Sequence, residues 1–239
     1  MFLFDLTLET SAENVALDEA LLEQAEASDE TWECLRLWES ARPIVVVGRS
    51  SQASVEVDLE ACRRREIAVL RRASGGAAIV AARGCLMYAL VLSYRARPEL
   101  RSLDAAHRFV LESMLAALQP LVPGVARRGT SDLAIGELKF SGNSVRCKRN
   151  TLLYHGTILY DFDLSLIDEL LRMPPRQPDY RQGRTHGAFV TNLPASSAAI
   201  CEAFIAEWKA DVTTTDWPRE RMRELVELRY AKDEWNFQR

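Results

Sequence analysis

The chain has 239 residues and a formal net charge of −4, with 30 basic and 34 acidic side chains. Acids and bases are interspersed, so we expect no nucleic-acid-binding surface, which would carry a basic surplus. No apolar run is long enough to span a bilayer, and the first residues lack the basic region of a signal peptide, so we expect no membrane segment. Apolar residues make up 48% of the sequence, enough for a sizeable core in a single domain over 1–239.

The cysteines and histidines argue against a metal site. The five cysteines are scattered and form no CxxC pair, and the sequence has only three histidines. We therefore expect reduced thiols, a cytoplasmic protein and no bound metal. The residues concerned are Cys34, Cys62, Cys85, Cys147, Cys201, His107, His155 and His186.

The first half of the chain alternates helical and extended patterns. Segment 12–27 places leucines on one face of an amphipathic helix, with Ser11 as its N-cap. Short apolar, β-branched runs predict strands, and a polar segment between two of them predicts a short helix that leaves Arg63–Arg65 in solvent. The predicted strands are 33–40, 43–48, 67–72 and 85–94, and the short helix is 57–66.

The second half begins with a long predicted helix over 103–120, which ends before Pro123. Three strand candidates follow at 131–136, 138–146 and 151–160. Helical patterns cover 163–173, 196–210 and 217–230, and the segment 174–187, with three prolines and two glycines, is predicted to be a flexible loop. Strands grouped apart from helices favour an α+β domain over a regular βαβ series.

A turn of small residues follows the strand that ends in Arg71 and Arg72. Its sequence is Ala73-Ser74-Gly75-Gly76-Ala77-Ala78. Glycine lets a ligand approach the backbone, and the N–H groups of such a turn bind phosphate or carboxylate oxygens that an arginine can also contact. The same pattern is typical of a tight turn with surface arginines, and its spacing matches neither a Rossmann fingerprint nor a P-loop.

Lys139 lies on the predicted strand 138–146, between Leu138 and Phe140. Strict alternation directs Lys139 to the face opposite these two apolar neighbours. A lysine in a cleft needs an anionic partner, which an acyl phosphate or a carboxylate would provide. A solvent-facing lysine on a hairpin is the alternative. On the next strand, His155 is interpreted as a base, a ligand contact or a core histidine with satisfied nitrogens.

Together and in this order, these segments resemble the lipoate–protein ligase A family, within the wider group of biotin/lipoate ligases and octanoyl transferases. The resemblance covers nearly the whole chain and implies a mixed, largely antiparallel sheet flanked by helices, as in class II synthetase catalytic domains. It also implies one catalytic domain over 1–239, without the C-terminal accessory domain of the longer ligases. The matching segments include Asn14–Ala20, Arg71–Ala78, Ser131–Leu133, Lys139–Asn143, His155–Leu159 and Arg229–Trp235.

Ligases of this family activate lipoate or octanoate with ATP and Mg²⁺ to an acyl adenylate. They then transfer the acyl group to a lysine on a lipoyl-domain protein of the 2-oxoacid dehydrogenase E2 or glycine-cleavage H protein type. The resemblance implies that Lys139 is catalytic and binds the acyl carbonyl and phosphate oxygens. The implied substrate- and adenylate-binding residues are Arg72, Ser74, Gly75, Gly76, Ala77, Ala78, Asp132, Gly142, Arg146, His155 and Thr157.

The sequence departs from the family pattern just after the turn. Ala77 replaces a third glycine, and Ala81-Ala82-Arg83-Gly84-Cys85 stands where the family has His-Asp and Gly-Asn. Three polar side chains are thus absent beside the expected nucleotide phosphates. A separate accessory chain in place of the missing domain is a further expectation.

These departures leave two alternatives open. Octanoyl and lipoyl transferases of the same group need no ATP and carry the acyl group as a cysteine thioester. Cys147 is the candidate nucleophile, because its neighbours Arg146 and Lys148 would stabilise a thiolate; Cys85 is the other candidate. The third possibility, from another class, is a non-catalytic binder of an acyl group or of a lipoylated partner.

Overall fold

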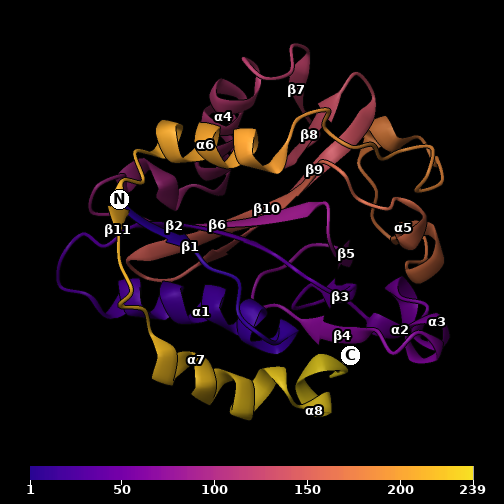
Figure 1. The fold of residues 1–239 in the computed structure, drawn as a ribbon, viewed down its shortest axis with the longest axis horizontal. Helices are drawn as coiled ribbons and strands as arrows, with labels where there is room; N and C mark the ends of the chain where they lie inside the picture. Colours follow the sequence, from indigo (N-terminus) through magenta and orange to yellow (C-terminus); the bar gives the residue numbers. More distant parts are fainter. Residues whose placement is uncertain (239) are drawn as a thin grey trace.

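The computed structural model describes residues 1–238, which fold around two β-sheets (Figure 1). Within this range the larger sheet has eight strands in the order β11-β1-β2-β6-β10-β9-β8-β7, and the smaller has three in the order β4-β3-β5. The larger sheet comprises β1 (Phe2–Asp5), β2 (Cys34–Glu39), β6 (Cys85–Ser93), β7 (Val125–Arg128), β8 (Asp132–Ile135), β9 (Leu138–Cys147), β10 (Thr151–Leu159) and β11 (Val212–Thr213). The smaller comprises β3 (Ile44–Val47), β4 (Ala68–Arg71) and β5 (Ile79–Ala81).

Both faces of the larger sheet are covered (Figure 1). Helices α4 (Leu103–Leu118) and α6 (Ser197–Trp208) lie on one face. Helix α1 (Ser11–Ala27) lies on the other, together with the smaller sheet, and α7 (Arg219–Leu225) packs against the outer side of α1. The remaining helical segments are α2 (Ala53–Glu56), α3 (Leu59–Arg64), α5 (Ser165–Leu170), α8 (Asp233–Asn236), the 3₁₀ turns Pro98–Arg101 and Asp179–Arg181, and a π turn, Val226–Tyr230.

Strand β6 shows how the sequence builds two cores. All nine of its residues are buried, and because successive side chains point to opposite faces, they divide between the two sides. Met87, Ala89 and Val91 pack toward α1, whereas Leu86, Tyr88, Leu90 and Leu92 pack toward α4 and α6. Strands β2 and β10 flank β6 and both run antiparallel to it. The predicted fold class, a mixed and largely antiparallel sheet flanked by helices, is confirmed.

Helix α1 begins with a capping box. The Thr10 hydroxyl accepts from the Glu13 N–H, and the Glu13 carboxylate accepts from the Thr10 N–H. The predicted N-cap, Ser11, was therefore one residue too late. The prediction of an amphipathic helix was also wrong, because every residue from Asn14 to Leu22 is buried. The large sheet, α7 and the π turn surround the helix, so even its polar residues are drawn into the interior.

Most predicted elements are present with changed ends. The helix predicted over 57–66 is α3, which follows the separate short helix α2, and Arg63–Arg65 are exposed as expected. The helix predicted over 217–230 is α7 followed by the π turn. Strands β1, β5, β7 and β11 were not predicted, since each has four residues or fewer and shows too little periodicity.

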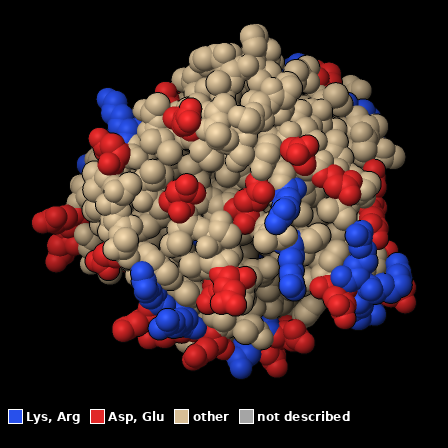
Figure 2. Space-filling model, in the orientation of Figure 1, with Lys and Arg blue, Asp and Glu red and all other residues tan. Residues whose placement is uncertain are grey.

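Charged residues of both signs are intermixed on the face of the molecule drawn in Figure 2. No extended patch of a single sign dominates this view, in agreement with the near balance of acids and bases in the sequence. Among residues 1–238, no helix has both the length and the apolar character that a bilayer crossing requires.

Replacement of the capping residue tests the start of α1. Thr10→Ala removes the acceptor of the Glu13 N–H, so we expect the free energy of unfolding to fall by about 1 kcal/mol. Urea denaturation measures the change. Thr10→Ser keeps the hydroxyl and should retain most of the stability; equal losses in both variants would contradict the cap assignment.

Candidate active site

Two adjoining cavities open between the larger and the smaller sheet. The larger has a volume of about 630 Å³ and the smaller about 160 Å³. Lys139 lines both, so its side chain stands where the two cavities meet. The other residues common to both linings are Ala77, Ala78, Ile79, Gly142, Thr157, Arg176 and Pro178.

Lys139 is held by an acidic partner on the neighbouring strand. Its Nζ lies 2.7 Å from Asp132 Oδ1, and Tyr180 donates its hydroxyl proton to Asp132 Oδ2 at 2.8 Å. Burial and the adjacent Asp132 carboxylate raise the pKa of Tyr180, so its hydroxyl stays protonated. The Lys139 side chain is 28% exposed. The predicted cleft-facing lysine is therefore observed, with a carboxylate of the protein as its partner.

The position of Lys139 depends on two local features of β9. The pairing of β8 with β9 shifts between Leu133 and Ala134, which leaves Phe140 as an extra residue in a bulge. Strict alternation is therefore broken, and Leu138 is exposed while Phe140 is fully buried. Gly142 is the second feature, because a Cβ at this position would lie 2.8 Å from Lys139 Nζ. Only glycine leaves the ammonium its present room.

The small-residue turn after β4 is organised by Arg72. Its guanidinium donates to Ser74 Oγ and to the carbonyls of Val46, Gly75 and Ala77. Burial lowers the pKa of Arg72 to about 10, and Glu56 opposes that shift. The guanidinium remains charged at neutral pH. Arg72 therefore supports the turn from beneath, and the interpretation of Arg71 and Arg72 as surface arginines is wrong, since both are buried.

The tip of the turn presents free donors. Gly76 and Ala77 are exposed, and both line the larger cavity. Among residues 1–238, neither backbone N–H has a hydrogen-bond acceptor. The Ala78 N–H, in contrast, donates to Glu56 Oε2 at 2.7 Å. The turn can therefore offer two successive N–H groups to an anion in the cavity.

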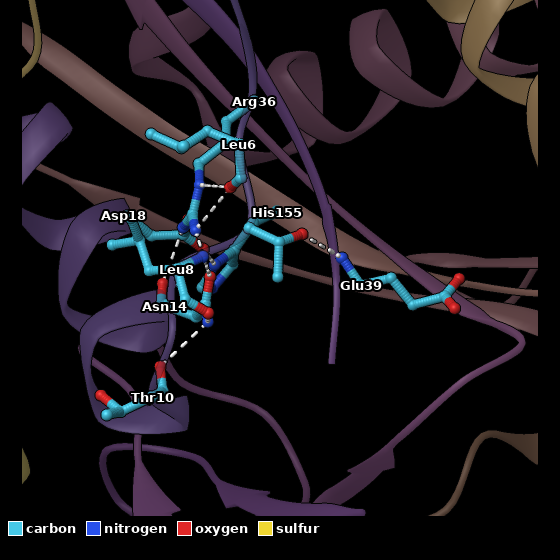
Figure 3. Close-up of polar contacts among 9 residues, drawn as sticks. Leu6, Leu8, Thr10, Asn14, Asp18, Arg36, Glu39 and His155 are labelled. Carbon is cyan, nitrogen blue, oxygen red and sulfur yellow. Dashed lines mark hydrogen bonds and ion pairs between the residues drawn. The ribbon is translucent and has the colours of Figure 1, made fainter. Parts of the chain in front are cut away.

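His155 of β10 belongs to a buried chain of polar contacts that also includes the turn, α1 and β2. Its Nε2 lies 2.5 Å from Ser74 Oγ and its Nδ1 lies 3.0 Å from Asp18 Oδ2. Figure 3 shows Asp18 and Asn14 of α1 facing Arg36 of β2, which contacts Asp18 Oδ1 at 2.6 Å and Asn14 Oδ1 at 2.8 Å. Of the interpretations of His155, a histidine with both nitrogens satisfied is the one observed, although His155 also lines the larger cavity.

The Ser74–His155–Asp18 order is that of a catalytic triad, but its location is wrong for a nucleophile. Ser74 is fully buried and lines neither cavity. Its hydroxyl also accepts from Arg72 Nε at 3.1 Å. A substrate carbonyl in the cavity therefore cannot reach Ser74 Oγ. The chain of contacts fixes the turn to the core of the larger sheet.

Most of the predicted site residues lie together around the cavities. Arg72, Gly76, Ala77, Ala78, Asp132, Lys139, Gly142, His155 and Thr157 line one or both. Ser74 and Gly75 lie just behind this lining, in the body of the turn. Arg146 lines neither cavity, contrary to its predicted place in the wall.

Neither candidate nucleophile reaches a cavity. None of the five cysteines, all of which lie within the described residues, lines either one. Cys147 packs against the core on the α4 and α6 side, and Cys85 is fully buried. Burial raises the pKa of the Cys85 thiol, which disfavours a thiolate there.

Several lining residues were not predicted. Asp18 and Trp38 line the larger cavity, and Arg176 and Pro178 of the loop 174–187 line both. Asp18 could have been predicted from the sequence. Asn14 and Asp18 lie one helical turn apart in an otherwise apolar helix, and buried polar groups require hydrogen-bonding partners. No sequence pattern could have predicted Arg176, because its position depends on how an irregular loop folds back over Asp132.

Asp18 gives the clearest stability prediction. Burial raises its pKa, but the charge of Arg36 and the hydrogen bond with His155 outweigh that effect and hold the pKa below its usual value. Asp18→Asn leaves Arg36 buried without its counter-ion, so we expect the free energy of unfolding to fall by about 3 kcal/mol at neutral pH.

The depressed pKa also fixes the sign of the pH dependence. The ion pair contributes fully above the unfolded-state pKa and is lost as the pH falls through the lower folded-state value. Urea denaturation between pH 6 and pH 2 should show a smaller acid-induced loss in Asp18→Asn than in the wild type. The control is Glu30→Gln, an exposed site. Identical pH profiles in the wild type and Asp18→Asn would contradict the assignment.

Comparisons with known proteins identify the family of this chain. Residues 10–212 match the family model of the lipoyl protein ligase A/B catalytic domain. The octanoyltransferase LipM of Brevibacillus brevis is 26% identical over 95% of each chain. A Mycoplasma genitalium protein described as a lipoate-protein ligase A is 29% identical over 67% of this chain, which covers 46% of that longer protein.

Two solved structures share the fold. The bi-partite lipoate protein ligase of Thermoplasma acidophilum has a TM-score of 0.83 at 23% identity, covering 99% of this chain and 95% of that one. A lipoate-protein ligase A solved with ATP has a TM-score of 0.82 at 24% identity, covering 99% and 98%. The match to the family model extends over most of the chain. The protein is an enzyme of the lipoate–protein ligase and octanoyltransferase family.

Proposed function

We propose that this protein attaches lipoate or octanoate to a lysine of a lipoyl-domain protein through an acyl adenylate. The observation that carries the proposal is the place of Lys139. Its ammonium stands at the junction of two cavities, beside a turn whose Gly76 and Ala77 N–H groups are free among residues 1–238. An activated carboxyl group at this junction would meet a cation and two backbone donors.

The larger cavity suits a fatty acyl chain with a polar end. Part of its wall is apolar and includes Val15, Trp38, Val46 and Met87, all of them buried. Another part carries Lys139, with Asp132 as its partner. Burial of each methylene contributes about 0.8 kcal/mol, so an eight-carbon chain gains binding energy along the apolar wall while its carboxyl group lies at Lys139.

The smaller cavity provides a place for the adenosine. Apolar side chains, among them Val80, Phe140, Leu171 and Phe189, form much of its wall. Arg176 lines both cavities and has no ion-pair partner among the described residues, so it is available to phosphate oxygens. Within residues 1–238 no three His, Cys, Asp or Glu side chains gather to hold a metal, so we propose that Mg²⁺ would enter with the nucleotide phosphates.

The chemistry then has two steps. A carboxylate oxygen of the acid attacks the α-phosphorus of ATP, which forms the acyl adenylate and releases pyrophosphate. The acceptor lysine amine next attacks the acyl carbonyl carbon, the bond from that carbon to the phosphate oxygen breaks, and AMP leaves with the electron pair while the nitrogen loses a proton to solvent. Negative charge grows on the carbonyl oxygen in this step, and Lys139 is placed to stabilise it.

ATP-independent octanoyl transfer is the second candidate. It is favoured by the similarity to the octanoyltransferase LipM, which extends over 95% of both chains. The absence of every cysteine from the cavity linings argues against a thioester on this chain. Incubation of the protein with octanoate and ATP, or with an octanoyl carrier protein, distinguishes the two reactions by the intact mass of the products.

The proposed partner is an acceptor lipoyl domain of the E2 or H-protein type. The Thermoplasma acidophilum ligase is described as bi-partite and as having its own E2 lipoyl domain. By analogy, we propose that a separate accessory chain acts with this single catalytic domain. Cytoplasmic location stays a prediction, supported by the five free cysteines within the described residues.

Substitution of Lys139 tests the catalytic assignment. An ammonium about 4 Å from a developing charge contributes about 4 kcal/mol at an effective dielectric of 20. We therefore expect Lys139→Ala to slow acyl transfer by about a thousandfold, with little change in the circular dichroism spectrum. Lys148→Ala is the control, because Lys148 pairs with Glu23 outside the cavities. Undiminished transfer by Lys139→Ala would exclude the proposed role.

Substitution of Cys147 separates the two mechanisms. Because Cys147 lies outside both cavities, we expect Cys147→Ser to retain the acyl-transfer rate within about twofold of the wild type. Single-turnover transfer to a lipoyl domain provides the measurement. A covalent acyl-enzyme in the wild type that disappears in Cys147→Ser would instead support the thioester mechanism.

A further inference from the structure

The last residues of the described chain pack against the base of the small-residue turn. Helix α8 contacts β4, the strand that leads into the turn, and lies near it in Figure 1. The Arg71 N–H donates to Asn236 Oδ1 at 2.9 Å, and the Trp235 Nε1–H donates to the Arg71 carbonyl at 2.9 Å. The Arg71 guanidinium donates in addition to the carbonyls of Trp235 and Asn236.

Trp235 and Asn236 are themselves fixed. Asn236 is buried and donates from Nδ2 to the Tyr230 carbonyl at 3.0 Å. The Arg229 guanidinium lies over the Trp235 ring, 5.3 Å from its centroid. Tyr230 in turn donates to the buried Glu19 of α1 at 2.7 Å. The C-terminal segment is therefore bound to α1 through Tyr230, and its last residues contact the end of β4.

Arg71 connects the C-terminal segment to a second loop. Its NH1 group donates to the carbonyls of Gly48 and Ser51, each at 2.7 Å. This loop, residues 48–51, lies directly against the turn. The Arg49 N–H donates to the Ser74 carbonyl at 2.8 Å, and the Ser51 hydroxyl donates to the Gly76 carbonyl at 2.9 Å.

The loop and the turn pack so closely that a side chain at Gly48 would not fit. A Cβ at Gly48 would lie 1.9 Å from the Gly76 carbonyl oxygen. The Gly76 carbonyl is thus fixed toward Ser51, and in a trans peptide the N–H of the next residue points the opposite way. The Ala77 N–H is therefore directed away from the loop. The Gly75 carbonyl, held by Arg72 and Ser144, orients the Gly76 N–H in the same manner.

We propose that Trp235 and Asn236, which lie beyond the matched residues 10–212, are positioning residues for the anion-binding turn. They act through Arg71 and the loop 48–51, and they set the direction of the Ala77 N–H. The effect on catalysis rests on the proposed role of the turn, whereas the effect on the turn itself does not.

Hydrogen exchange provides a test that is independent of activity. In full-length Asn236→Ala, Arg71 loses an acceptor, so the hydrogen-bonded amides of Arg49 and Ala78 should exchange about tenfold faster than in the wild type. Asn236→Asp keeps the acceptor oxygen and should restore most of the protection. Leu228→Ala, at a 69% exposed site on the same segment, is the matched control and should show no change.

Kinetics provides the second readout. In Asn236→Ala, we expect the KM for the acid substrate to rise about tenfold while kcat changes much less, because a misdirected N–H weakens ground-state binding. Trp235→Phe, which keeps an aromatic ring but loses the N–H donor to the Arg71 carbonyl, is the second variant and should show the same pattern more weakly. A folded Asn236→Ala with wild-type exchange at Arg49 and Ala78 would overturn the proposal. Faster exchange without acyl transfer in any variant, wild type included, would support it and contradict only the proposed function.

Discussion

The buried ion pair between Asp18 and Arg36 is the interaction on which the site depends. Both side chains lie in the interior, and Arg36 also donates to the carbonyls of Leu6 and Asn14 (Figure 3). A buried arginine of this kind is tolerable only when its donors are satisfied. The pair fixes α1 against β2, and the second oxygen of Asp18 then orients His155 on β10. The Asp18 carboxylate that joins α1 to the larger sheet thus also positions His155 in the cavity wall.

The cavities exist because two sheets meet without merging. The smaller sheet supplies the turn, and the larger sheet supplies Lys139, Asp132 and Thr157. Polar contacts connect the turn to the larger sheet: Ser144 Oγ donates to the Gly75 carbonyl, and Ser74 Oγ lies within hydrogen-bond distance of His155 Nε2. These contacts hold the donor-rich turn in the wall of the same cavity as Lys139.

The sequence predicted the fold class and the main cavity residues because their signals are local. The apolar period of β6, the small residues from Ala73 to Ala78 and the lysine between two apolar neighbours are all readable in a few residues. Arg146 was misplaced because the resemblance gives its place in the sequence, not the direction of its side chain on β9. Because of the bulge at Phe140, the side chains that face the core differ from those expected from strict alternation, and no local sequence pattern predicts a bulge.

Tertiary contacts between distant segments account for the rest. Asn236 contacts Arg71 across 165 positions, and Tyr180 contacts Asp132 from a loop without regular periodicity. The burial of α1 on all sides was not predicted, because Asn14, Asp18 and Glu19 give its sequence the pattern of a helix with a polar face. Their partners, Arg36, His155 and Tyr230, come from elements that sequence spacing cannot bring together.

The departures from the family pattern weigh less than the sequence alone suggested. Ala81, Ala82 and Cys85 are buried and line neither cavity, so small side chains there suit the packing of the smaller sheet against the core. Charge at the cavities is supplied instead by Lys139, Arg176 and the N–H groups of the turn. In the role that we propose for it, such a set would stabilise a carbonyl oxygen in an acyl adenylate and in a carrier thioester alike. The choice between the two reactions therefore depends on what the smaller cavity binds, rather than on Lys139.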